Sequence, residues 1–222
     1  MTQPSANLNW IRTQPKNSQT VVDAVCSTAE AALLDGSWSS MSLDDLFRRA
    51  GVQSSEASSR IGHKEIVLRL LHERCMTDAA ATVDAILAVE RWKGASIPEI
   101  ARTVLTFAIQ TYHERQNFLR AMIVVSGSDD ELRERSRSLQ RQIGESIRKL
   151  ILSRRKELLH PAPAIAAEFT SRLVHGFLVE RTLTGESVEG DSIKLTQEQV
   201  TTELIHAVLS YLGVFSTEAW DS

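Results

Sequence analysis

The sequence has no basic surplus, only two cysteines and no long apolar run, and each of these absences excludes a class of protein. Its 222 residues contain 25 Lys and Arg against 28 Asp and Glu, which gives a formal net charge of −3. A dedicated nucleic-acid-binding domain usually carries an excess of basic residues. Any basic surface in this chain must therefore be local, and its candidate residues are Arg48, Arg49, Arg60, Lys64 and Arg69.

The two cysteines, Cys26 and Cys75, are too few for a disulfide framework, and each lies in an apolar, helical context. We expect both to be small buried residues with reduced thiols, because a cytosolic setting disfavours disulfides. The N-terminus has no apolar core of a signal peptide, and no window approaches the roughly 20 apolar residues of a membrane span. The sequence therefore predicts a cytoplasmic protein that does not use a membrane.

Signatures of catalysis and metal binding are missing as well. No pair of histidines has the HExxH spacing, neither cysteine has a histidine at a useful helical spacing, and Gly51 and Gly62 are isolated rather than part of a phosphate loop. The histidines are scattered along the chain at His63, His72, His113, His160, His175 and His206. We therefore predict no enzyme activity, no catalytic residues, no metal site and no cofactor.

What the sequence does contain is helical periodicity, with almost no strand signal, no internal repeat and the ordinary apolar content of a soluble protein, 42%. The fold class predicted is all-α, with about nine helices. A first helix is expected over Ser18 to Leu34, and a long helix from Lys64 to about Glu90. Further helices are expected over Ser96 to Arg115, Phe118 to Val125, Glu131 to Leu159, Ala164 to Thr182 and Thr196 to Gly213.

The segment from Ser42 to Glu65 has the pattern of a helix-turn-helix. Leu43, Leu46 and Phe47 recur at helical spacing, and Ser42 is placed to cap that helix. Gly51 suits the left-handed conformation that ends a helix, and a second short helix follows with Ala57 and Ile61 on its inner face. In such a motif the second helix enters the major groove of DNA.

Here the chain resembles the TetR family of bacterial transcriptional regulators. In order, the helix-turn-helix of that family has a Leu/Ile-Ala pair, an Ala-Gly-Val turn, a short recognition helix and a Lys-Glu pair that opens the next helix. The matching residues in this chain are Leu46-Phe47, Ala50-Gly51-Val52, Gln53 to Ile61 and Lys64-Glu65. The spacing fits without a gap from Ser42 to Leu71, and the all-helical remainder fits as well.

The resemblance implies a three-helix helix-turn-helix head and a helical ligand-binding and dimerisation body. The expected divisions are a flexible arm at 1–17, the DNA-binding domain at 18–65, the ligand-binding and dimerisation domain at 66–215 and a tail at 216–222. The partners implied are a double-stranded DNA operator, a small-molecule effector that is apolar or aromatic, and a second copy of the chain. The homodimer is expected to form through the last two helices, because two heads about one duplex turn (~34 Å) apart are needed to read a two-fold operator.

The residues expected to contact DNA are polar or basic and lie in or beside the recognition helix. They are Ser42, Gln53, Ser54, Ser55, Ser59, Arg60, His63 and Lys64. Gln53, Ser54 and Ser59 are candidates for base edges. Lys64 and Arg60 are predicted to hold phosphates.

The ligand is expected among large apolar side chains of the body, with a few polar groups to orient it. The residues proposed for this site are Trp92, Phe107, Tyr112, Phe118, Met122, Phe169, His175 and Phe177. Each of them taken singly is more often an ordinary core residue, so the prediction concerns the group.

The function predicted is a TetR-like DNA-binding transcriptional regulator, a repressor that a small-molecule ligand releases from its operator. An alternative rests on departures from the family pattern: Ser58 stands where Tyr is usual, and Glu56 adds negative charge close to the phosphates. On this alternative the chain is a TetR-like ligand-binding protein that has lost specific DNA binding. A second alternative, an all-helical enzyme, has no motif in its support.

Overall fold

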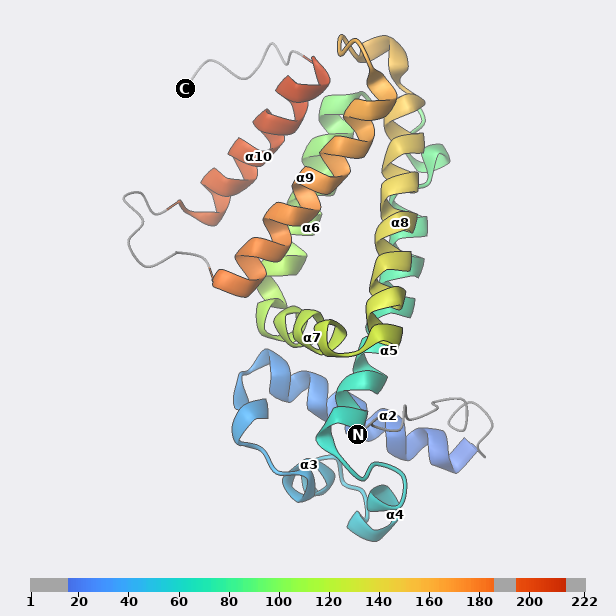
Figure 1. Cartoon of the computed structure of the whole chain (residues 1–222), viewed down its shortest axis with the longest axis vertical. Helices are drawn as coiled ribbons and strands as arrows, with labels where there is room; N and C mark the ends of the chain where they lie inside the picture. Colours follow the sequence, from blue (N-terminus) through green and yellow to red (C-terminus); the bar gives the residue numbers. More distant parts are fainter. Residues whose placement is uncertain (1–15, 186–194, 215–222) are drawn as a thin grey trace. The chain divides into compact units, whose positions relative to one another are not determined.

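The chain is all-helical in the computed structural model, which describes residues 16–185 and 195–214 (Figure 1). These residues form nine α-helices and three short 3₁₀ helices, without a strand among them, which confirms the predicted fold class. The predicted C-terminal tail, and the predicted arm except for residues 16 and 17, lie outside the described residues.

The chain divides into two compact units, and some helices contribute residues to both. The first unit, here called the head, comprises the residues up to Cys75 together with Asn117–Arg133. The second unit, here called the body, comprises Met76–Gln116 and the residues from Glu134 onward.

The head contains three complete α-helices, nearly all of a fourth (α7), a 3₁₀ helix and the starts of α5 and of the helix that follows α7. These elements are α2 (Lys16–Leu34), η1 (Ser37–Ser40), α3 (Leu43–Arg49), α4 (Ser54–Ser58), the first half of α5 (Lys64–Ile86) and α7 (Gln116–Ser128). Their apolar faces meet in one core, in which Val25, Ala29, Leu46 and Phe47 have no measurable exposure. The helical spacing read from the sequence thus identified the buried face of α3 correctly, since Leu46 and Phe47 are among these core residues.

Helix α7 belongs to the head rather than to the body, in which the sequence had placed it. Phe118 and Met122 are 2% and 3% exposed and lie in the same core as Leu46 and Phe47. Asn117 Nδ2 donates to the carbonyl of Leu34 at the end of α2 (3.4 Å). The expected boundary at 65/66 therefore differs from the structure in two ways: the head extends along α5 to Cys75, and it recruits a helix from later in the chain.

The body contains the remaining helices, of which α6, α9 and α10 pack side by side (Figure 1). Its elements are the rest of α5, η2 (Val89–Trp92), α6 (Ile97–Glu114), α8 (Asp130–Leu152) from Glu134 onward, η3 (Arg155–Glu157), α9 (Pro163–Thr184) and α10 (Gln197–Leu212). Ser96 and Thr196 cap α6 and α10 through capping boxes, as their sequence contexts predict. Two long helices end earlier than predicted, α5 at Ile86 and α8 at Leu152, and each is followed by a short 3₁₀ turn.

No helix among the described residues is long and apolar enough to cross a membrane. Residues 16–185 and 195–214 also bring together no group of three or more His, Cys, Asp or Glu that is arranged to hold a metal ion.

Candidate nucleic-acid interface

Helix α3 is fixed at its start by a reciprocal cap between Ser42 and Asp45. The backbone N–H of Asp45 donates to Ser42 Oγ (3.1 Å), and the backbone N–H of Ser42 donates to Asp45 Oδ2 (3.3 Å). The Ser42 hydroxyl also donates to Asp45 Oδ2 (2.6 Å), and this bond, followed by the one from the Ser42 backbone N–H, lowers the pKa of the Asp45 carboxyl. Ser42, predicted to contact DNA, is therefore already engaged in capping α3.

The turn after α3 depends on Gly51, whose φ is +67°. Side chains other than glycine rarely adopt this left-handed conformation. With the chain reversed there, the N–H of Val52 donates to the carbonyl of Phe47 (3.1 Å). The turn thereby sets the direction in which α4 leaves α3, which is the geometry of a helix-turn-helix.

Helix α4 buries one face and exposes the other. Ala57, and Ile61 just beyond the helix, have no measurable exposure and pack into the head core. Side chains on the remaining faces are exposed, and they include most of the predicted DNA contacts: Gln53, Ser54, Ser55 and Ser59. His63, in the link to α5, is exposed as well. The structure therefore brings five of the eight predicted residues together on one exposed segment between α3 and α5.

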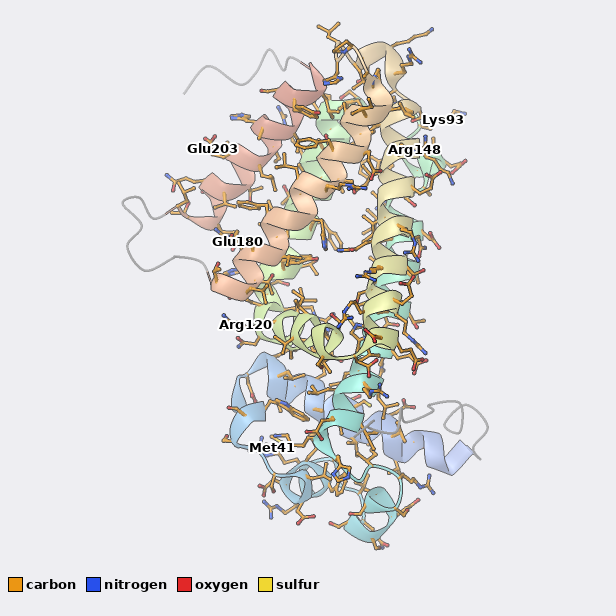
Figure 2. All side chains as sticks on the ribbon, viewed as in Figure 1. Met41, Lys93, Arg120, Arg148, Glu180 and Glu203 are labelled. Carbon is orange, nitrogen blue, oxygen red and sulfur yellow. The ribbon has the colours of Figure 1, made fainter. Side chains whose placement is uncertain are left out.

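Lys64 is turned into the head, contrary to its predicted contact with phosphate. Its ammonium donates to the main-chain carbonyls of Trp38 and Met41, each at 2.7 Å, and lies 4.3 Å from the centre of the Trp38 ring. Met41, one of these two partners, is labelled in Figure 2. Two of the three N–H groups of the Lys64 ammonium are therefore used inside the protein. We assign Lys64 a structural role, in which it holds the start of α5 against the segment between α2 and α3.

Most of the head's other cations are paired with carboxylates. Arg60 contacts Glu56 one turn earlier (3.3 Å), Arg48 pairs with Asp45, and Arg69 forms a largely buried ion pair with Asp129. Arg49, at the end of α3, is exposed and forms no salt bridge within the described residues. Sequence reasoning counted Arg49 among the basic residues but left it out of the site, and its position beside the turn makes it a phosphate-binding candidate.

The predicted ligand site does not assemble as one group. Phe118 and Met122 are core residues of the head, so their assignment to a ligand site in the body is corrected. Phe107 and Phe169 are 45% and 50% exposed, and the ring of Phe169 packs against Tyr211 with centroids 5.1 Å apart. Periodicity marked these rings as apolar without showing which unit or which face each occupies.

The other four predicted ligand residues are half-buried in the body and come from several helices. Trp92 donates from Nε1 to the carbonyl of Ile86 (2.7 Å), and Tyr112 and Phe177 border the core shared by α6, α9 and α10. His175 Nε2 is hydrogen-bonded to Nε2 of Gln140 on α8. Burial lowers the pKa of His175 below its usual value, because the protonated ring loses solvation.

Two pockets in the body differ greatly in size. One, of about 20 Å³, lies between α6 and α9 and includes Tyr112, a predicted ligand residue. The other, of about 550 Å³, lies between the segment from η2 to the cap of α6 and the segment that follows α8, and Lys93, labelled in Figure 2, is one of its lining residues. Its lining consists of Val89, Glu90, Lys93, Gly94, Ala95, Ser96, Arg154 and Glu157, none of which sequence reasoning had proposed.

Two polar side chains that line the larger pocket already form hydrogen bonds with the backbone at the start of α6. Arg154 Nε donates to the carbonyl of Ala95 (2.9 Å), and the Glu157 carboxylate accepts from the N–H of Ile97 (2.8 Å). The volume falls in the range of small-molecule sites. The sequence signal that could have indicated this pocket is the Trp92-Lys93-Gly94 break between two helices.

Known proteins resemble this chain in structure but not in sequence. No family model and no curated protein sequence matches it. A crystal structure described as a TetR-family transcriptional regulator from Mesorhizobium loti superposes with a TM-score of 0.64 at 13% identity, covering 90% of this chain and 98% of that one. GusR of Salmonella enterica gives 0.60 at 10% identity, with 90% and 98% covered. The transcriptional regulator SCO7518 of Streptomyces coelicolor gives 0.54 at 13% identity, with 89% and 99% covered. The chain therefore has the fold of a TetR-family regulator, and the resemblance drawn from Ser42 to Leu71 is confirmed at the level of fold.

Proposed function

We propose that this protein is a DNA-binding transcriptional regulator, a repressor that leaves its operator when a small molecule binds to the body. The observation that carries the proposal is the helix-turn-helix built by α3, Gly51 and α4. Its inner face is anchored by Ala57 and Ile61, and its outer face presents exposed polar side chains. Hydroxyl and amide groups on such a helix are the groups that read base edges in the major groove.

A homodimer is part of the proposal, because one head covers only half of a two-fold operator. Helix α9 supports it with an exposed apolar stripe. Ile165, Phe169 and Leu173 are 67%, 50% and 38% exposed at four-residue spacing, and Leu183 continues the same face. Exposed apolar surface of this kind usually marks an interaction site.

Helix α10 exposes less apolar surface for a dimer contact than expected from the prediction that the last two helices form it together. Its apolar residues, among them Leu204, Val208 and Leu212, are buried in the body core. Its exposed side chains include Glu203, labelled in Figure 2, and His206. We therefore propose α9 as the centre of the dimer contact, with α10 at its polar edge.

Coupling between ligand and DNA is assigned to α5. This helix is continuous from Lys64 to Ile86, and the division between head and body falls within it, after Cys75. A ligand that shifts the body half of α5 would move the head half with it and lower the affinity for the operator. Couplings of this kind amount to about 1–3 kcal/mol, or roughly 5–150-fold in affinity.

A second candidate function is favoured by the charge of the head. Its acidic residues outnumber its basic ones over 16–75 and 117–133, and Lys64 is turned inward. On this reading the chain is a helical ligand-binding protein without an operator. A titration of the duplex that flanks its own gene distinguishes the two, because a regulator binds that DNA more tightly than an unrelated duplex and a degenerate head does not.

A further inference from the structure

Glu56 lies on the part of α4 that a major groove would meet. Successive helix residues are about 100° apart, so the burial of Ala57 directs Ser55 and Glu56, and Ser59 at the end of the helix, away from the head core. All three are exposed, and 43% of the Glu56 side chain is accessible to solvent. The carboxylate therefore stands among the side chains proposed to contact bases.

The negative charge of Glu56 is balanced by a residue just beyond the helix. Arg60 lies one turn later, and its Nη2 is 3.3 Å from Glu56 Oε1. The carboxylate also remains partly exposed to solvent, and each of its oxygens has lone pairs for more than one hydrogen bond. A paired carboxylate approaches phosphates at less electrostatic cost than an isolated one.

An ionised carboxylate only accepts hydrogen bonds, which limits the bases it can read. In the major groove cytosine presents the N4 amino group as a donor, whereas guanine and thymine present acceptors, and adenine sets an acceptor beside its donor. We propose that Glu56 is a specificity-determining residue that accepts a hydrogen bond from cytosine N4, so that α4 selects a C·G pair in each half-site. This inference rests on the proposed DNA-binding function and deepens it.

The test is a selection of DNA sequences from a randomised duplex library by the full-length protein and two variants. Glu56→Gln removes the charge and supplies an amide, which pairs with adenine N6 and N7. Glu65→Gln removes the same charge from an exposed residue in the first turn of α5 and is the matched control. Thermal unfolding of both variants verifies that the head remains folded.

We expect the wild type to enrich a motif with one C·G pair per half-site. Replacing that C·G pair in the duplex should weaken wild-type binding about tenfold. The Glu56→Gln motif should shift from cytosine to adenine at that position, while Glu65→Gln keeps the wild-type motif. An unchanged motif in Glu56→Gln overturns the role of Glu56 and leaves the DNA-binding function standing. A wild type that enriches no motif overturns the proposed function, and the base-reading role falls with it.

Discussion

At the scale of single residues, charge alone did not reveal the role of a side chain. Lys64 is a cation at the start of α5, directly after the segment predicted to read DNA, and it was therefore predicted to hold a phosphate. The structure gives its ammonium two carbonyl partners, from Trp38 and Met41, which lie 26 and 23 residues earlier. Contacts over such separations depend on how the chain folds back, and local sequence patterns do not contain that information.

We expect Lys64→Met to lower the free energy of unfolding by about 2 kcal/mol, because it leaves two carbonyls without their charged donor. Lys156→Met, which removes an exposed lysine beside α8, is the matched control and should leave stability nearly unchanged. Urea denaturation followed by circular dichroism measures both. Equal effects in the two variants would contradict the structural role assigned to Lys64.

His175 should make stability depend on pH. Burial lowers its pKa in the folded state below 6.5, so near and below that pH the unfolded chain binds a proton that the folded chain does not. Stability contributed by the neutral ring is therefore present above pH 6.5 and is lost as the pH falls below it. His175→Gln should flatten this part of the profile, measured as the free energy of unfolding between pH 7.5 and 5, and His206→Gln, at an exposed position on α10, is the control. An unchanged slope in His175→Gln would rule out this contribution.

At the scale of elements, helical spacing predicted which face of a helix is buried better than it predicted the partner of that face. The apolar face of α3 is buried as expected, and capping boxes form at Ser42, Ser96 and Thr196. Helix α7 is apolar enough to be buried in either unit, and its place in the head rests on distant contacts. The Arg69–Asp129 ion pair and the Asn117–Leu34 hydrogen bond are two of them, and no local pattern indicates either.

The exposed stripe of α9 leads to a prediction about assembly. Ile165→Glu places a charge within the proposed dimer contact, where it would be desolvated without a partner. Light scattering after size-exclusion chromatography should give twice the 24.7 kDa chain mass for the wild type and the single chain mass for the variant. Val124→Glu, at a 63% exposed apolar position on α7, should remain dimeric. A single-chain wild type, or a dimeric Ile165→Glu, would contradict an α9 contact.

At the scale of the whole molecule, the chain combines a regulator's fold with a net negative charge. Non-specific affinity for DNA comes mainly from basic side chains that neutralise phosphates. Here Lys64 is turned inward and Arg48, Arg60 and Arg69 are paired with carboxylates. The proposed function therefore requires that DNA binding depend more on base contacts from the α4 face than on bulk charge.

The most direct test of this account is a fluorescence-anisotropy titration of the duplex that flanks the protein's own gene. Two variants extend it: Ser55→Glu adds a charge to the exposed face of α4, and Ser138→Glu adds the same charge to an exposed serine of α8. We predict that the wild type and Ser138→Glu bind this duplex more tightly than an unrelated one, and that Ser55→Glu binds it at least about tenfold more weakly. No preference by the wild type at low salt, or equal losses in both variants, would contradict the claim that α4 reads DNA.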